Sequence, residues 1–369
     1  MSSKEQHVVN PITPEFIERL DPQFTELYNK YQACRLRADQ VTITQYRADP
    51  SKYTSGIGEG PMPDVGSSTL HSLNVHEPEG YINVLVYWPS QQAIESGNLR
   101  NNCGLPAHVN YHGGGWVTGN LKSDQSWCRQ VCQALGIVVV DVDYRLAPEY
   151  PFPTQITDSW TALTWILRNG ANLGIDESRV SIGGMASGSH IAAVLAIKAR
   201  DTLEMPQLKL QLLVVPIFDV RFVPLEGSCN AGVPYESYIT CENAPCFPLS
   251  RMQWFANHWL GTNPESRRRN ANTWEASPIL ASSHGNLAPA SIHCAEIDIL
   301  LSEAIAYHEK LLAAGTRSSI KVYKGVCHPF GLWTGKLDKA KECINDAVTA
   351  LRNAHALYEP VVLGQILKL

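Results

Sequence analysis

The fold is decided by one stretch of the sequence, which runs Arg179-Val180-Ser181-Ile182-Gly183-Gly184-Met185-Ala186-Ser187-Gly188-Ser189-His190. The apolar residues at its start predict a buried strand, the glycines predict a sharp turn, and residues 191–196 continue as a helix. When such a strand-to-helix turn is written G-x-S-x-G, the strained backbone lifts the serine above the end of the sheet.

In this chain the serine is missing. The only register with glycines two residues before and two residues after a central residue is Gly184-Met185-Ala186-Ser187-Gly188. The central residue, Ala186, has no nucleophilic atom. The side chain of Ser187 leaves the turn one residue later and in another direction, so we do not expect it to act as the nucleophile.

Predicted strands and helices alternate on both sides of this turn. Apolar strand signals occupy residues 82–88, 107–111, 137–140, 180–182, 212–215, 290–295 and 320–323. Helix signals occupy residues 125–135, 158–169, 188 onward, 302–314 and 336–355. Continuous apolar strands separated by helices predict an α/β chain with a mostly parallel sheet that is covered on both faces.

Two segments lie outside this alternation. Residues 1–75 precede the first strong strand and begin with a helix-start signal at Thr13-Pro14. Residues 222–276 interrupt the alternation with prolines, aromatic residues and a short helical piece. We therefore predict an N-terminal cap or lid over residues 1–75 and a cap insertion over residues 222–276. The core then comprises residues 76–221 and 277–369.

The composition is that of a globular protein. The 369 residues are 44% hydrophobic, and the mild net charge of −5 argues against nucleic acid as an obligate partner. No apolar run is long enough for a membrane span, and residues 1–7 lack the apolar region of a secretory signal. We expect a cytoplasmic protein. The C-terminal Leu367-Lys368-Leu369 shares only its last two residues with the peroxisomal S-K-L signal.

The ten cysteines have no spacing typical of a disulfide framework. Cys128 and Cys132, like Cys241 and Cys246, lack a second pair at zinc-finger spacing. The sequence therefore predicts a reduced compartment, no metal and no cofactor.

A glycine-rich turn follows the predicted strand at 107–111 and reads His112-Gly113-Gly114-Gly115-Trp116. Successive glycines let the backbone turn so that its N–H groups point into a site, where they can hold a developing oxyanion. A phosphate-binding loop would need G-K-[ST] or a G-x-G-x-x-G register, and neither is present. We interpret the turn as an oxyanion loop of the HGGG type.

Further segments complete a recognisable set. They are Asp143-Tyr144-Arg145-Leu146-Ala147-Pro148-Glu149, Ser277-Pro278-Ile279-Leu280, Ala295-Glu296-Ile297-Asp298 and His328-Pro329-Phe330. Together with the glycine-rich loop and the strand-to-helix turn, they make the chain resemble the hormone-sensitive-lipase-like family of α/β-hydrolases over most of residues 80–335. The resemblance implies an α/β-hydrolase fold with a helical cap and a carboxylic-ester hydrolase site.

The resemblance also implies two partners of the missing serine. Asp298 follows a late strand and His328 follows the last strand, which are the family's places for the catalytic acid and base. An acid in this place can accept the imidazole N–H and stabilise the imidazolium, while the histidine moves the proton. Glu296 is the alternative acid, but it lies two residues deeper in the strand.

The other site residues follow from the same resemblance. Ala186 occupies the nucleophile position, and the N–H groups of Gly113, Gly114 and Ser187 are expected to form the oxyanion hole. Trp116, beside the loop, is expected to contact substrate. The expected ligand is an apolar or aromatic small-molecule ester or lactone, and a homodimer stays an open alternative.

Three explanations of Ala186 stay open at this stage. The chain can be an inactivated variant of a working esterase, which we favour because the rest of the site is in place. It can be a serine-independent lyase or cyclase, as plant relatives of this family are. It can also be a non-catalytic receptor resembling the gibberellin receptor.

Overall fold

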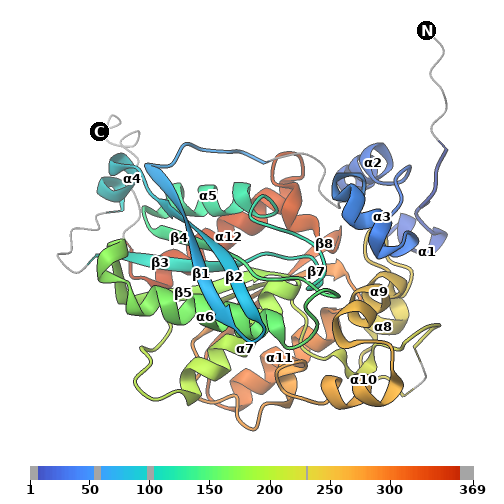
Figure 1. The fold of residues 1–369 in the computed structure, drawn as a ribbon. Coiled ribbons are helices and arrows are strands. Elements are labelled where there is room, and N and C mark those ends of the chain that lie inside the picture. The colour runs from blue at the N-terminus through green and yellow to red at the C-terminus, as the bar shows by residue number, and fades with distance from the viewer. Residues whose placement is uncertain (1–6, 54–59, 98–103, 230–231, 358–369) are drawn as a thin grey trace, which may run out of the picture.

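The structure is a computed structural model that describes residues 7–53, 60–97, 104–229 and 232–357 (Figure 1). Its centre is one eight-stranded sheet with the strand order β1-β2-β4-β3-β5-β6-β7-β8. The strands are β1 (Ser67–His76), β2 (Glu79–Trp88), β3 (Leu105–Tyr111), β4 (Val138–Asp143), β5 (Ile175–Met185), β6 (Gln211–Val214), β7 (Ala290–Ile297) and β8 (Ser318–Cys327). Strand β2 pairs antiparallel with β1 and β4, and all other neighbours are parallel.

Helices cover both faces of this sheet, as the sequence predicts (Figure 1). One layer holds α4 (Gln91–Ser96), α5 (Gln125–Leu135) and α12 (Asp338–Ala354). The other holds α6 (Thr154–Arg168), α7 (Ser187–Asp201) and α11 (Leu301–Ala313). Strand β4 is buried along almost its whole length, which explains the run of valines with which it begins.

The boundary predicted at residue 75 needs a correction. Residues 67–76 form β1, which belongs to the sheet rather than to the N-terminal cap. This edge strand is mostly exposed, with Leu70 more than half exposed, so it carries no apolar run to mark it in the sequence. The cap segment in the structure therefore ends before Ser67.

Two groups of short helices lie together at one end of the sheet (Figure 1). The N-terminal group comprises α1 (Pro14–Ile17), α2 (Pro22–Tyr31) and α3 (Ile43–Ala48), and the later group comprises α8 (Ser237–Thr240), α9 (Leu249–Leu260) and α10 (Pro264–Ala271). The side chain of Asp21 caps α2 by accepting the N–H groups of Gln23 and Phe24. Phe24 then stacks on Trp333 of the core at 4.8 Å. The N-terminal segment is thus packed firmly onto the sheet domain.

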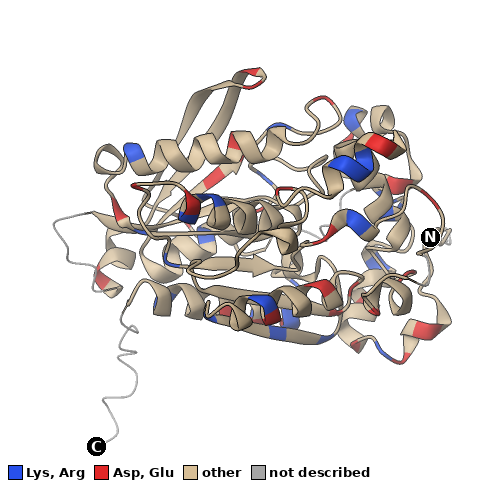
Figure 2. Cartoon of the chain, turned by 90° about the horizontal axis from the view of Figure 1, so that it is seen from below, with Lys and Arg blue, Asp and Glu red and all other residues tan. Residues whose placement is uncertain are grey.

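The charged residues are distributed over the surface. Lysine and arginine alternate with aspartate and glutamate on the face that Figure 2 shows. No helix among the described residues combines the length and the apolar character that crossing a membrane requires. The tripeptide Leu367-Lys368-Leu369 lies outside the described residues.

The strand-to-helix turn at Ala186 is locked by two close approaches to β3. A Cβ atom at Gly188 would overlap the carbonyl oxygen of Tyr111, and one at Gly184 would overlap the same oxygen. Only glycine lets the end of β5 and the first turn of α7 pack this tightly against β3. The two glycines thereby bring the turn next to the loop that starts at His112.

Replacing Gly188 by alanine is expected to lower the free energy of unfolding by about 3 kcal/mol or more, because a buried backbone atom has to move to accommodate the new methyl group. Urea denaturation measures this change. Gly232→Ala is the matched control, because no atom lies within 4 Å of the Cβ position there. The control should change stability by less than about 0.5 kcal/mol. Equal, small effects of both substitutions would contradict this account of the packing.

Candidate active site

The turn between β5 and α7 has the backbone of a nucleophile turn. Ala186 has φ 52° and ψ −114°, a strained conformation for a residue with a side chain. Its N–H donates to the carbonyl oxygen of Val214 at 2.9 Å, which holds the turn on β6. The methyl group of Ala186 lines a cavity at this end of the sheet. The backbone of Ala186 is therefore strained, although its side chain has no hydroxyl.

Ser187 does not replace the missing hydroxyl. Its side chain is fully buried and is not among the residues that line the cavity. The hydroxyl lies instead against the phenol of Tyr144, whose pKa is raised by burial and lowered by Ser187. As the first residue of α7, Ser187 offers its backbone N–H, which donates no hydrogen bond within the described residues. The side chain of Ser187 therefore stays out of the cavity, while its backbone N–H is free to donate.

Asp298 and His328 are brought together by β7 and β8. The Nδ1–H of His328 donates to Oδ2 of Asp298 at 3.0 Å, while Oδ1 accepts the N–H of Leu300 at 3.0 Å. Both side chains are almost completely buried, and the ring of Phe247 stacks on the imidazole at 4.2 Å. With Nδ1 held by the carboxylate, Nε2 of His328 is left to exchange a proton in the cavity that this residue lines.

The alternative acid, Glu296, is used elsewhere. Its carboxylate binds Nζ of Lys324 at 3.0 Å and accepts the N–H of Gly325 at 2.8 Å. These contacts join the end of β7 to the part of β8 where the pairing register shifts. The carboxylate of Glu296 is thus not bound to the imidazole of His328. The geometry therefore favours Asp298 as the acid.

The glycine loop after β3 is braced from behind. Nδ1 of His112 hydrogen-bonds the carbonyl oxygen of Gly113 at 2.8 Å, and the ring stacks on Tyr144 at 4.3 Å. Tyr144 in turn donates to the carbonyl oxygen of His112 at 2.7 Å. Burial lowers the pKa of His112 to about 4, so the ring is neutral at pH 7 and serves as a structural support.

The N–H groups of the loop are not equivalent. The N–H of Gly113 lies against the carboxyl group of Asp124, whose pKa burial raises to about 6 while Asn110 and this N–H lower it. Gly114 and Gly115 donate no backbone hydrogen bond within the described residues, and both line the cavity. Gly114 therefore meets the expectation of a free donor. Gly115, which the sequence analysis did not select, offers a freer donor than Gly113.

Trp116 lies elsewhere than the sequence analysis predicts. Its ring is fully buried and stacks on Trp259 of α9 at 3.7 Å, and it does not line the cavity. Its Nε1–H donates to Nδ1 of His190 at 3.1 Å. Trp116 has φ 63°, so the backbone turns the ring away from the loop's inner face and towards the cap. Its ring therefore anchors the loop to α9 and lies outside the cavity.

His190 connects this anchor to the rest of the cap. Its Nε2–H donates to the carbonyl oxygen of Ala276 at 3.2 Å, while Nδ1 accepts from Trp116. Burial lowers the pKa of His190 to about 3, so the ring is neutral under ordinary conditions. A single neutral imidazole thus links the glycine loop, α7 and the segment after α10.

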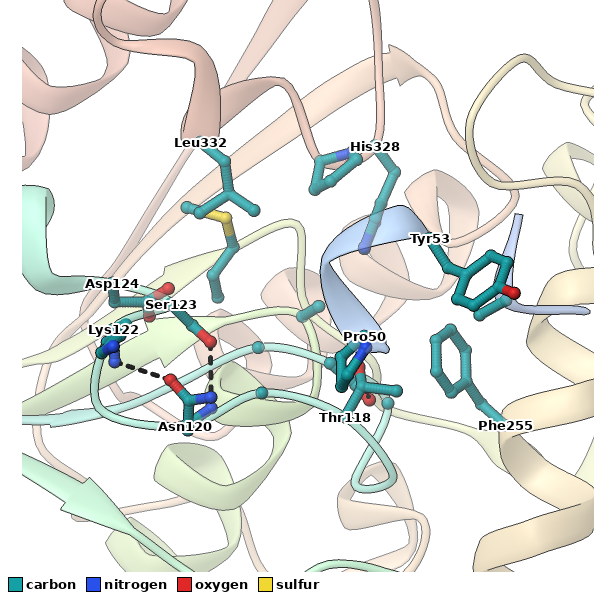
Figure 3. Close-up of a pocket in the computed structure, with 18 of the residues that line it drawn as sticks. Pro50, Tyr53, Thr118, Asn120, Lys122, Ser123, Asp124, Phe255, His328 and Leu332 are labelled. Carbon is teal, nitrogen blue, oxygen red and sulfur yellow. Dashed lines mark hydrogen bonds between the residues drawn. The ribbon is translucent and has the colours of Figure 1, made fainter. Parts of the chain in front are cut away.

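The cavity encloses about 570 Å³, a volume typical of small-molecule sites. Figure 3 shows Pro50 and Tyr53 of the N-terminal segment on one side and Phe255 of α9 beside them. His328 and Leu332 face them from the core. The cavity is therefore closed by two segments that are far apart in the sequence.

Sequence analysis did not identify the cavity residues of these two segments. Tyr46, Pro50 and Tyr53 have no signal that distinguishes them from other cap residues. Phe247, Arg251 and Phe255, however, follow at four-residue spacing, which is the spacing of one helix face. In the structure Arg251 and Phe255 lie on α9, and Phe247 precedes the N-cap of that helix. No group of histidine, cysteine or acidic side chains suited to a metal occurs among the described residues.

Lowering the pH from 7 to 5 is expected to destabilise the protein through His190. The unfolded state takes up a proton near pH 6.5, whereas the folded state does so only near pH 3. The contribution of His190 to stability is therefore present above pH 6.5 and is lost as the pH falls towards 3. Between pH 7 and 5 the loss is about 2 kcal/mol.

Denaturation curves of the parent chain and of His190→Gln at both pH values measure this effect. The substituted chain should lose about 2 kcal/mol less than the parent chain over the same interval. An identical pH dependence of both chains would show that His190 is not the titrating group.

Comparisons with known proteins identify the family and the fold. A family model described as alpha/beta hydrolase fold matches residues 108–332. AB hydrolase superfamily protein C1039.03 of Schizosaccharomyces pombe is 35% identical over 367 residues, which cover 96% of this chain and 100% of that protein. Esterase LipI of Mycobacterium tuberculosis is 31% identical over 282 residues, or 76% of this chain and 80% of the esterase.

A solved structure shows the same likeness. It is a serine-to-alanine mutant of LAE6, an alpha/beta hydrolase enzyme from the metagenome of Lake Arreo, Spain. The two chains superpose with a TM-score of 0.77 at 27% identity, over 91% of this chain and 99% of the other.

Proposed function

Because this chain belongs to the alpha/beta-hydrolase-fold family, whose members related to it include an esterase, we propose that it carries a carboxylesterase-type site that lacks its nucleophile. The site binds the carbonyl group of an ester or lactone, and Ala186 prevents formation of an acyl-enzyme. Restoring a serine at this position restores ester hydrolysis.

One observation carries this proposal. The strained turn at Ala186, the His328–Asp298 pair and the free N–H groups of Gly114 and Ser187 all survive around a residue that has no hydroxyl. Strain of this kind costs of the order of 1–3 kcal/mol and is kept where a site requires it. The arrangement is that of a complete hydrolase site minus one oxygen atom.

Each remaining group has a place in the reaction that a serine would complete. The serine hydroxyl would attack the carbonyl carbon while Nε2 of His328 takes its proton. Asp298 holds the imidazole and stabilises the imidazolium through Nδ1. The N–H groups of Gly114, Gly115 and Ser187 would hold the oxyanion, and the positive end of α7 adds to this stabilisation.

The walls of the cavity support an apolar or aromatic ligand. Tyr46, Tyr53, Phe247 and Phe255 contribute aromatic rings, and Met252 adds a flexible apolar side chain. Such surfaces favour an aromatic or alicyclic group beside the ester. The substrate that we propose is accordingly a small apolar ester or lactone.

A second candidate is general-base chemistry without a serine. It is favoured by His328, which lines the cavity together with Ala186 and is held through Nδ1 by Asp298. Nε2 of His328 can then take a proton from a carbon acid in the ligand and return it to a leaving group. This is the lyase or cyclase alternative.

Ala186→Ser is expected to raise kcat for short p-nitrophenyl esters by several orders of magnitude, because loss of a triad serine costs about 10^6 in kcat. The new serine should also be labelled by a serine-directed phosphonate. Ser187→Ala in the same background is the matched control, and it should keep the activity because only its N–H is used.

The outcomes separate the three explanations. No ester cleavage and no labelling of Ala186→Ser would overturn the esterase proposal. Turnover by the unchanged chain that His328→Ala abolishes would instead support the lyase or cyclase. Ligand binding with no turnover by either form would indicate a receptor.

A further inference from the structure

The segment 247–255, which enters α9 at Leu249, places a cation and two aromatic rings along the cavity. Phe247, Arg251 and Phe255 stand four residues apart and all line the cavity. Phe247 stacks on the imidazole of His328, and Phe255 packs so closely against Gly115 that a Cβ there would overlap its ring. Arg251 therefore lies between the two parts of the site that handle the ester.

Arg251 is buried without a counter-ion. The residue is only 7% exposed. Its Nη1 donates to the carbonyl oxygen of Cys246 at 2.7 Å. Nε has no hydrogen-bond partner, and Nη2 donates to no described residue. Within the described part of the chain, no carboxylate oxygen approaches the guanidinium to 4.0 Å.

The carboxylate that acts on Arg251 through space is already paired with another arginine. Asp39 interacts with Arg251 through space, but both of its oxygens bind the guanidinium of Arg37 at 3.0 Å. Ser250 donates a third hydrogen bond to the same carboxylate at 3.1 Å. Burial raises the pKa of the Tyr46 phenol, so Tyr46 stays neutral and supplies no negative charge.

The side chains that line the cavity carry more positive than negative charge, which favours an anionic ligand. Its other basic residues are Arg47, which binds Glu149 at 2.9 Å, and Lys122. Its one acid is Asp124, which burial holds partly protonated near pH 6. A buried guanidinium keeps its charge, and leaving it unpaired costs several kcal/mol. A ligand that brings a carboxylate would remove this cost.

We propose that Arg251 is a binding site for a carboxylate group of the ligand, while the ester or lactone carbonyl of the same molecule lies at the glycine loop. This inference rests on the proposed function, because it takes the ester site as the other anchor. The planar fork of the guanidinium matches a carboxylate through two parallel hydrogen bonds. Phe247 and Phe255 cover the apolar part between the two anchors.

Two ligands that differ only in charge test the proposal. Monobenzyl succinate carries an ester and a free carboxylate, and benzyl methyl succinate is its neutral counterpart. Isothermal titration of the full chain should give a Kd about tenfold to a hundredfold lower for the monoacid, as expected for hydrogen bonds to a charged group. Because Ala186 stops acyl-enzyme formation, binding is measured without turnover.

Variants assign the preference to one side chain. Arg251→Met and Arg251→Gln should bind both ligands with the Kd that the parent chain shows for the neutral one. The glutamine variant can still donate to Cys246, which protects the fold. Arg269→Met makes the same change of charge at an exposed position of the cap and should keep the preference.

Each result is decisive. Equal Kd values for the two ligands in the parent chain overturn the carboxylate site but leave the ester site standing, and this comparison needs no variant. A preference that persists in Arg251→Gln, or that disappears in Arg269→Met, also overturns it. Binding of neither ligand contradicts the ester site as well.

Discussion

The close packing of the Ala186 turn against the end of β3 is the constraint on which the site depends. Gly184 and Gly188 leave room for the backbone at Tyr111, and the glycine loop starts one residue later. A sheet strand, a helix terminus and a loop are thereby joined without intervening side chains. The N–H groups that can hold an oxyanion gain their positions from this contact and not from the residue at the centre of the turn.

This dependence explains why the site geometry persists with alanine at position 186. The supports of the glycine loop are buried residues behind it, such as Tyr144 and the Trp116–His190 pair. The His328–Asp298 pair is likewise held by the sheet and by the ring of Phe247. None of these contacts involves the side chain at position 186, so the packing does not depend on a hydroxyl there.

The cap gives the cavity its chemical character. In the proposed ester site, the core supplies the groups that would recognise any ester, namely backbone N–H groups and an imidazole. Selectivity must come from what closes the cavity, which is the N-terminal segment and one face of α9. Burying the unpaired guanidinium of Arg251 costs free energy. A ligand with a negative charge would remove this cost, so Arg251 points to the charge of the ligand.

The fold class and the order of the proposed site residues follow from the sequence alone, because both depend on local patterns. Apolar strands alternate with helices, and Ala186, Asp298 and His328 follow the ends of predicted strands. Strand β1 escaped detection because an exposed edge strand needs no apolar run. The tertiary structure alone decided that Trp116 faces Trp259, that the Ser187 hydroxyl faces Tyr144, and that Arg251 enters the cavity. The orientation of each of these side chains is set by contacts between segments that are far apart in the chain. A local sequence pattern holds no information about such contacts.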